Sequence, residues 1–435
     1  MQFPPANGTT GLAGTPGRSV ALVTNYIPEQ GRPWDDIREE MQGMRGRDLD
    51  WRHGRHGAYV WYAGDDLEDV LREAYGMFLV ENGLGIRVFP SIQRMEAEVL
   101  ATAADLLSAP EGSAGIFTSG GTESIFLAIY AAREWARATL PDIAVPEFVA
   151  PHSAHPALNK AAHLLGMTVT RVPVGPDFRA DPAALEAAIS PSTIGIYCSA
   201  PTYSLGLVDP VPAISEVAAA RGLWLHVDAC VGGILAPSVR ELGYAVPPFD
   251  FANAGVTSIS ADLHKSGFLA KPASTVTFRT AGHHAYARYR FDDWPSGLYQ
   301  GFNFTGSRPG GPIAAAWAGQ QFLGREGYRR LAASSMRTKE ALITSLGEIP
   351  GFRLHGQSDL WSFAFALDGV AAPALAGAMF KRGWVTGVTT SPAGIHVMPT
   401  PVHEPFSDEY VHAIRECAAE VQAGSAPEAA PARYN

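Results

Sequence analysis

The residue whose type and setting best suit covalent chemistry is Lys265, which stands beside His264 at the end of the segment VTSISADLHK. The segment is largely apolar, so it predicts a strand with the lysine just beyond its carboxyl end. Partial burial can lower the pKa of a lysine by up to about 3–5 units, which raises the neutral, nucleophilic fraction and suits imine formation with an aldehyde. Most lysines are solvated surface charges, so Lys265 alone does not establish a site.

An acidic residue, Asp228, closes a second apolar run, LWLHVDAC. A buried carboxylate needs a partner, because leaving its charge unpaired costs several kcal/mol. The protonated ring nitrogen of a cofactor would be such a partner, and the pairing would keep the ring a strong electron sink. The alternative is an aspartate that caps a helix or pairs with a structural arginine.

The segment TSGGTES joins a predicted strand to a predicted helix and carries Gly120, Gly121 and Thr122. Two glycines let the backbone approach an anion closely, and the first N–H groups of the helix favour a phosphate. The segment is neither a GxGxxG dinucleotide loop nor a P-loop, which would need a lysine. By itself it is equally typical of a tight turn before a helix.

A planar side chain, His155, lies in SAHPALNKAA between the predicted strand EFVAP and a helix. An imidazole at this place can stack on a cofactor ring, although a lone histidine is more often an ordinary loop or core residue. The joint occurrence of an anion cradle, a planar ring, a buried acid and a lysine, each at a strand end, favours one interpretation. It gives a partner to the phosphate, ring face, ring nitrogen and aldehyde of pyridoxal 5′-phosphate.

Short apolar runs and helical stretches alternate along the part of the chain that carries these residues. Strands covered by helices on both faces form a mainly parallel sheet, and such sheets bind ligands at the carboxyl ends of their strands. Helices are expected from Gly64 onward, with acidic residues in the first turn, and from about Arg94 to Leu107. The seven expected strands are AGIFTS, EFVAP, VTRVPV, TIGIYCSAP, LWLHVDAC, VTSISAD and STVTFRT.

A different pattern follows Gly324, where a long helix precedes LWSFAFAL and AGIHVMPT and indicates a smaller α+β domain. No internal repeat is found. The expected organisation is a tail and extension over 1–56, a helical segment over 57–112, a large cofactor-binding domain over 113–325, a small domain over 326–422 and a disordered tail over 423–435.

The composition narrows the class of ligand and the compartment. A formal net charge of −10 over 435 residues, without basic clusters, argues against a nucleic-acid partner and favours a small molecule. The three cysteines have no disulfide or zinc spacing. No signal peptide or apolar run long enough for a membrane helix is found, so we expect a cytoplasmic protein without stable membrane insertion.

Six ordered motifs give the chain a family resemblance: TSGGTES, SAHPALNKAA, VDPVP, HVDACVGG, VTSISADLHK and GSRPGG. From about Gly57 to Thr400 the chain resembles the sphingosine-1-phosphate lyases, in their soluble bacterial form. This implies the aspartate-aminotransferase fold of type I, with a seven-stranded sheet, in the group II decarboxylase-like branch. It implies that Lys265 is the Schiff-base lysine, Asp228 the pyridinium partner and His155 the stacking residue, and that the phosphate is held by Gly120, Gly121, Thr122 and His264.

The resemblance also implies a homodimer whose active sites are shared between subunits. The GSRPGG loop would come from the partner subunit and would bring Ser307 near the cofactor phosphate. By its resemblance to the shorter bacterial form, we expect the chain to have no membrane anchor like that of the eukaryotic lyases, in agreement with a cytoplasmic location.

Departures from the family pattern concentrate at the substrate end. The family's NPLH reads NGLG here, so Gly85 replaces a histidine, and Ser266 and Gly301 replace a tyrosine and a serine. Tyr62 and Lys271 stand at matching positions and are expected to bind substrate. Arg87 is a new positive charge, either a carboxylate-binding residue or an exposed replacement without a catalytic task.

The reaction expected first is retro-aldol cleavage of a β-hydroxy amine, phosphorylated or free, to an aldehyde and an amine. A base must remove the hydroxyl proton, and Lys265, Tyr62 and His155 are the candidates. The alternatives are an amino-acid decarboxylase or a β-hydroxy-α-amino-acid aldolase, with Arg87 or Lys271 binding the carboxylate. A non-catalytic cofactor carrier and an aminotransferase are the readings from other classes.

Overall fold

The computed structural model describes residues 27–46, 48–84 and 87–424. Residues 1–26 of the expected N-terminal tail and extension and residues 425–435 of the expected disordered tail lie outside these ranges, and so does Gly85. The chain forms two compact units, residues 1–49 and residues 50–435. The first contains helix α1 (Trp34–Arg45), whose acidic first turn and basic last turn complement the helix dipole.

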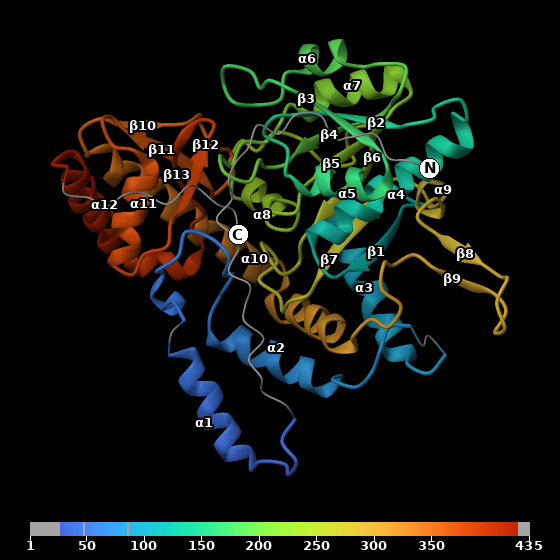
Figure 1. Ribbon diagram of the computed structural model, residues 1–435, viewed down its shortest axis with the longest axis horizontal. Helices are drawn as coiled ribbons and strands as arrows, with labels where there is room; N and C mark the ends of the chain where they lie inside the picture. Colours follow the sequence, from blue (N-terminus) through green and yellow to red (C-terminus); the bar gives the residue numbers. More distant parts are fainter. Residues whose placement is uncertain (1–26, 47, 85–86, 425–435) are drawn as a thin grey trace. The chain divides into compact units, whose positions relative to one another are not determined.

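A seven-stranded sheet forms the centre of the second unit (Figure 1). Its order is β1-β7-β6-β5-β4-β2-β3, in which β7 runs antiparallel to both β1 and β6 and the remaining pairs are parallel. All seven expected strands are confirmed, as is the α/β fold. They are β1 (Ala114–Thr118), β2 (Glu147–Pro151), β3 (Thr168–Val172), β4 (Thr193–Ser199), β5 (Trp224–Asp228), β6 (Val256–Ala261) and β7 (Ser274–Phe278).

Successive residues along the strands enter two separate cores, because side chains alternate between the faces of a sheet. Val149 and Ile196 belong to one core, whereas their neighbours Phe148 and Tyr197 belong to the other. Helices α4 (Gly121–Thr139) and α5 (Ala157–Leu165) cover the second face. The first core is covered by α3 (Pro90–Leu106), α7 (Val211–Arg221), α8 (Ala236–Glu241) and the start of α10 (Gly310–Gly347).

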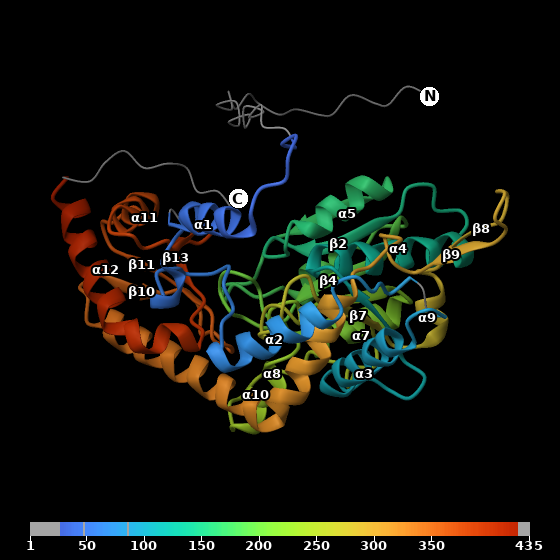
Figure 2. The ribbon, with the colours of Figure 1, turned by 90° about the horizontal axis from the view of Figure 1, so that it is seen from below.

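The C-terminal part forms the expected small α+β domain. Helix α10 contributes to the central core near its start and to the C-terminal core near its end, and it packs against α2 (Asp65–Met77) and α12 (Ser407–Gln422) (Figure 2). The small antiparallel sheet has the order β10-β11-β13-β12. Its elements are β10 (Phe352–Leu354), β11 (Phe363–Leu367), α11 (Ala372–Lys381), β12 (Gly387–Thr390), β13 (Ala393–Val397) and η2 (Pro401–Phe406).

Three shorter helical elements are η1 (Trp51–His53), α6 (Pro182–Ala187) and α9 (Ala281–Ala285). A hairpin of β8 (Tyr289–Phe291) and β9 (Tyr299–Gly301) precedes α10. No helix in the described ranges combines the length and apolar character that crossing a bilayer requires.

Of two expected helix starts, one is wrong and the other is confirmed. Helix α3 begins at Pro90 rather than Arg94, because proline fits the first helical turn, where its missing N–H costs nothing. A long helix is also expected from Gly324, and Gly324 does separate two helical segments within α10. Gly324 has φ 56° and marks a break inside it, which explains why the sequence pattern changes there.

Candidate active site at the carboxyl ends of the central strands

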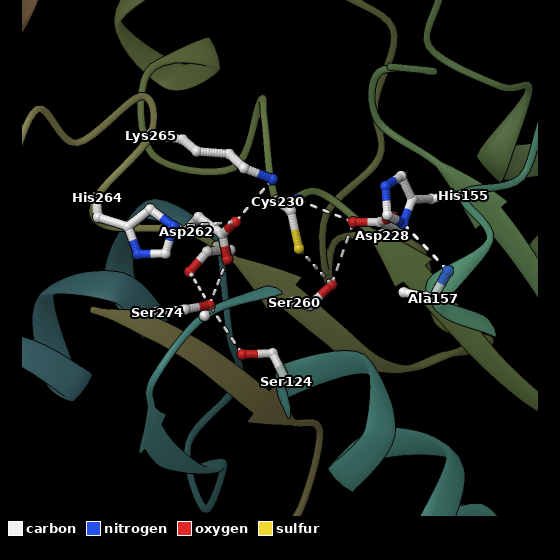
Figure 3. Close-up of polar contacts among 12 residues, drawn as sticks. Ser124, His155, Ala157, Asp228, Cys230, Ser260, Asp262, His264, Lys265 and Ser274 are labelled. Carbon is white, nitrogen blue, oxygen red and sulfur yellow. Dashed lines mark hydrogen bonds and ion pairs between the residues drawn. The ribbon is translucent and has the colours of Figure 1, made fainter. Parts of the chain in front are cut away.

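A cavity of about 360 Å³ opens where the carboxyl ends of β4, β5 and β6 meet the start of α4. Its lining brings together most of the residues that the sequence assigned to a cofactor. They are Gly120, Gly121, Thr122, His155, Asp228, His264 and Lys265, joined by Ser119, Glu123, Tyr203, Cys230 and Asp262 among others. Figure 3 shows four of the assigned residues, His155, Asp228, His264 and Lys265.

Lys265 follows β6 and lies in an ion pair with Asp262, with 2.9 Å between Nζ and Oδ2. The lysine side chain is 27% exposed, whereas the aspartate is fully buried. Burial lowers the pKa of Lys265, but the charge and hydrogen bond of Asp262 outweigh burial and raise the pKa above its ordinary value. The expectation of a lowered lysine pKa is therefore wrong, because an acid three residues earlier compensates the ammonium.

Asp228, at the end of β5, is 7% exposed and has several protein partners. Tyr197 on β4 donates its hydroxyl to Oδ2 at 2.5 Å, and the backbone N–H of Cys230 donates to Oδ1 at 3.0 Å. Burial works to raise the pKa of Asp228, but His155, Tyr197 and Cys230 hold the pKa below its ordinary value. The side chain is therefore an ionised acid that faces the cavity.

The strand-to-helix turn after β1 has the features of an anion cradle. Gly121 begins α4, and the N–H groups of a first helical turn have no acceptor within the helix. A Cβ atom on Gly121 would stand 2.7 Å from Cys230 Sγ and 2.9 Å from Asp262 Oδ2, so only glycine fits. A Cβ on Gly120 would stand 3.3 Å from the His264 ring. The backbone here is open to a phosphate and closed to a side chain.

Two histidines complete the lining. His155, between β2 and α5, accepts the N–H of Ala157 at Nδ1 over 3.2 Å. Burial lowers its pKa, against the opposing charge of Asp228. His264 accepts the N–H of Ala273 at Nδ1 over 3.1 Å, and burial lowers its pKa as well. Both rings are therefore neutral near pH 7, which suits stacking and hydrogen bonding rather than charge pairing.

These groups fit pyridoxal 5′-phosphate. The cradle that excludes a Cβ suits the phosphate, the ionised Asp228 suits a ring nitrogen, His155 suits the ring face, and Lys265 suits the aldehyde. No group of three or more His, Cys, Asp or Glu in the described part of the chain could hold a metal ion.

A second cavity, of about 510 Å³, holds Tyr62 and Lys271 and shares His264 with the first. Tyr62 donates its hydroxyl to Asp65 at 2.6 Å and accepts a hydrogen bond from Arg52 at 2.9 Å. Lys271 donates to the carbonyl of Tyr59 at 3.1 Å. Much of the remaining lining is apolar and includes Trp61, Leu67, Leu71, Phe268 and Leu269.

Two expected site residues lie outside both linings. Arg87 and Ser307 are exposed and line neither cavity. The substituted Gly301 lies in β9, and Ser266 is fully buried with no hydrogen-bond partner for its hydroxyl among the described residues. Within one copy of the chain, the structure therefore brings together the cofactor residues but not Arg87 or Ser307.

Sequence reasoning missed Asp262 and Tyr197, whose side chains contact the assigned Lys265 and Asp228. The signal for Asp262 was present, because an acid three residues before a lysine can reach it in a turn. Asp209 in VDPVP was noted only as a motif. It is fully buried, accepts backbone N–H groups of Ala180 and Ser199, both at 2.8 Å, and thus fastens the end of β4.

Comparisons with known proteins indicate the same cofactor. Residues 16–367 match the pyridoxal-dependent decarboxylase conserved domain. The chain is 35% identical to the sphingosine-1-phosphate lyase of rice, over 90% of this chain and 74% of that protein. It is 34% identical to a probable L-aspartate decarboxylase of Pyrococcus furiosus, over 75% of this chain and 85% of that protein. The structure of a Burkholderia pseudomallei sphingosine-1-phosphate lyase superimposes with a TM-score of 0.88 at 35% identity, covering 92% and 94% of the two chains.

Proposed function

Because the chain belongs to the pyridoxal-dependent decarboxylase family, in its sphingosine-1-phosphate lyase-like branch, we propose that it cleaves a carbon–carbon bond in a β-hydroxy amine. The enzyme is a lyase that uses pyridoxal 5′-phosphate. The proposed products are an aldehyde and an amine, by retro-aldol cleavage. The observation that carries the proposal is the cavity in which Lys265, Asp228, His155 and the Gly120–Gly121 cradle face one another.

We assign the cofactor residues as follows. When bound, the cofactor supplies an electron sink for the carbanion that bond cleavage leaves. Lys265 is the attachment point, Asp228 holds the ring nitrogen, and His155 covers the ring face. Gly120, Gly121, Thr122 and His264 hold the phosphate.

The hydrogen bonds separate the candidates for the base that removes the hydroxyl proton. Burial and the bond to Asp65 raise the pKa of Tyr62, so the phenol keeps its proton near pH 7 and acts as a donor. His155 and Lys265 line the same cavity as Asp228 and are the two candidates for the base. Tyr62 and Lys271 bind the substrate from the second cavity, which joins the first at His264.

A substrate panel tests the reaction. Purified enzyme is incubated with phosphorylated amino alcohols, free amino alcohols and β-hydroxy amino acids, and aldehyde and carbon dioxide are measured. The proposal expects aldehyde from at least one β-hydroxy amine without carbon dioxide. Carbon dioxide from simple amino acids with no aldehyde from any member would overturn it.

The contribution of the second cavity is tested with Lys271→Met. The variant should raise KM more than it lowers kcat, because it removes a cation that binds the substrate rather than a reacting group. Lys381→Met, at the exposed end of α11, is the matched control and should leave both constants unchanged.

A second candidate function is amino-acid decarboxylation, and the similarity to the Pyrococcus furiosus relative favours it. The same electron sink serves both reactions, and the bond that is held perpendicular to the ring is the one that breaks. In that case Lys271 or Arg87 would bind the substrate carboxylate. Release of carbon dioxide in the panel distinguishes this reaction from retro-aldol cleavage.

We further propose a homodimer in which the partner subunit's loop over 306–311 approaches the cofactor. Two observations support it: Ser307 is exposed in the single chain, and large apolar side chains are exposed in two segments of the chain. They are Met77 at the end of α2 with Leu79, Val80, Leu84 and Val88 after it, and Tyr289, Phe291, Trp294, Leu298 and Tyr299 in the β8–β9 hairpin. Sedimentation should give twice the chain mass, and a monomer with full activity would contradict the proposal.

We also propose a cytoplasmic location. The three cysteines are buried, free thiols, as expected in a reducing compartment. Cell fractionation should place the enzyme with other cytoplasmic proteins, and recovery in a membrane or secreted fraction would contradict this.

A further inference from the structure

A chain of buried hydroxyl groups runs from the anion cradle to the lysine. Thr118 Oγ1 lies 2.6 Å from Ser124 Oγ, which lies 2.8 Å from Ser274 Oγ. Ser274 donates to Asp262 Oδ1 at 2.5 Å, and Asp262 Oδ2 pairs with Lys265 Nζ at 2.9 Å (Figure 3). The three hydroxyl residues and the aspartate are each at most 2% exposed. The chain thus connects β1, α4 and β7 to the turn after β6.

The direction of these hydrogen bonds follows from counting protons. An ionised carboxylate only accepts, and each hydroxyl has one proton to donate. Since Ser274 donates to Asp262, Ser124 must donate to Ser274, and Thr118 must donate to Ser124. All three dipoles therefore point toward Asp262, and aligned hydrogen bonds of this kind strengthen one another. The network fixes the position of the Asp262 carboxylate without neutralising its charge.

Among the described groups that act electrostatically on Lys265, Asp262 is the strongest. The Cys230 thiol and the Asp228 carboxylate also act to raise the pKa of the Lys265 amine. Burial raises the pKa of Cys230, so the thiol stays neutral, and Asp228 is held by Tyr197. The rings of His155 and His264 face the same cavity and are neutral.

We propose that Asp262 is a positioning residue that orients the amine of Lys265 toward the cofactor, and that the Ser274–Ser124–Thr118 chain holds Asp262 in place. The proposal rests on the assignment of Lys265 as the attachment point. Asp262 also abuts the phosphate cradle, since its carboxylate lies 2.9 Å from where a Cβ on Gly121 would stand. One fixed acid thus sets the geometry between the phosphate site and the reacting nitrogen.

If Asp262 only supported the packing around it, its replacement would leave the pH dependence of cofactor attachment unchanged. Attachment of an amine to an aldehyde forms one C=N bond and releases one water, and it requires the neutral amine, so the ammonium must first lose a proton. An opposite charge at this distance raises the pKa of an amine by about one to three units. Removing that charge should therefore move the pH at which attachment becomes fast, which a loss of packing alone would not do.

The test is the rate of attachment of pyridoxal 5′-phosphate to cofactor-free enzyme, followed by its visible absorption band as a function of pH. Asp262→Asn keeps the size of the side chain and removes the charge. We expect its pH midpoint to fall by about one to three units relative to wild type. Ser274→Ala keeps the charge but releases the carboxylate, so the limiting rate at high pH should fall while the midpoint moves less.

Thr275→Val is the matched control, because Thr275 is an equally buried neighbour on β7 whose hydroxyl donates to the Ala261 carbonyl and not to Asp262. An unchanged midpoint in Asp262→Asn would overturn the proposal. If Asp262→Asn does not fold, a limiting rate for Ser274→Ala equal to that of Thr275→Val would overturn it. Failure of wild type to form the band at all would instead refute the assignment of Lys265.

Discussion

Replacing Tyr197 with phenylalanine tests whether protein partners set the charge of Asp228. The Tyr197 hydroxyl is buried on β4, donates to Asp228 at 2.5 Å and helps to hold the pKa of that carboxyl below its ordinary value. A hydrogen bond to a charged group contributes about 1.5–3 kcal/mol, and about 1.4 kcal/mol corresponds to one pKa unit. Tyr197→Phe should therefore raise the pKa of Asp228 by about one to two units.

The consequence is measurable in cofactor binding. Asp228 must be ionised to pair with the ring nitrogen, so cofactor affinity is lost when this carboxyl becomes protonated. The pH at which affinity is lost should therefore be higher in Tyr197→Phe than in wild type, by about one to two pH units. The assay is equilibrium binding of pyridoxal 5′-phosphate, followed by absorbance as the pH is lowered from neutral. Near neutral pH the two affinities should stay close, because the carboxyl is ionised in both.

The matched control is Tyr410→Phe, which removes a buried hydroxyl that is hydrogen-bonded to Thr386 in the small domain. Its acid limb should coincide with that of wild type. If Tyr197→Phe also coincides with wild type, or if both variants shift equally, the assignment of Tyr197 as the group that tunes Asp228 is refuted.

Two further predictions concern stability. Gly121→Ala should destabilise the fold by about 1–3 kcal/mol and weaken cofactor binding, because the added methyl group meets Cys230 and Asp262. Gly377→Ala in α11 is the control: an added Cβ there has no neighbouring atom within 4 Å, so the variant should be neutral or stabilising. Urea unfolding of both variants checks this, and equal effects would contradict it. Burial lowers the pKa of His226 to about 4 from 6.5, so the unfolded chain binds a proton in this pH range that the folded chain does not. As the pH drops from 6.5 to 4, His226 should therefore lower the free energy of unfolding by about 3 kcal/mol. The His226→Gln variant should lack this part of the loss. If its stability depends on pH as that of wild type does, the assignment to His226 is wrong.

The central sheet and the cofactor residues could be predicted from sequence because their signals are local. Continuous apolar runs predicted all seven strands of the central sheet, and each residue assigned to the cofactor chemistry follows or closes such a run. Parallel strands bring their carboxyl ends to one edge, so Asp228 and Lys265 had to lie near each other once the strand order placed β5 beside β6.

The electrostatic state of the site could not be predicted in the same way. The sequence suggested a neutral lysine because burial lowers the pKa of an amine, but the buried acid at Asp262 reverses that effect. Tyr197 reaches Asp228 only because β4 and β5 pair in a register that sets Tyr197 opposite His226. Such contacts depend on the pairing of strands far apart in the chain, which no local pattern reveals.

The substrate end was harder to predict for a geometric reason. Tyr62 precedes α2 and Lys271 follows β6, so they come from distant segments and meet in a separate cavity that touches the cofactor cavity at His264. Arg87 is exposed outside both linings. In the proposed dimer, the partner subunit would complete this end of the site, and contacts between subunits leave no local pattern in the sequence.

The most direct test of the account identifies the lysine that carries the cofactor. Enzyme loaded with pyridoxal 5′-phosphate is reduced with borohydride, digested, and the labelled peptide is sequenced by mass spectrometry. The account predicts a single label on Lys265, which Lys265→Ala abolishes together with the visible band and Lys271→Ala retains. A label on Lys271 or another lysine, or no label on colourless wild-type enzyme, would contradict it.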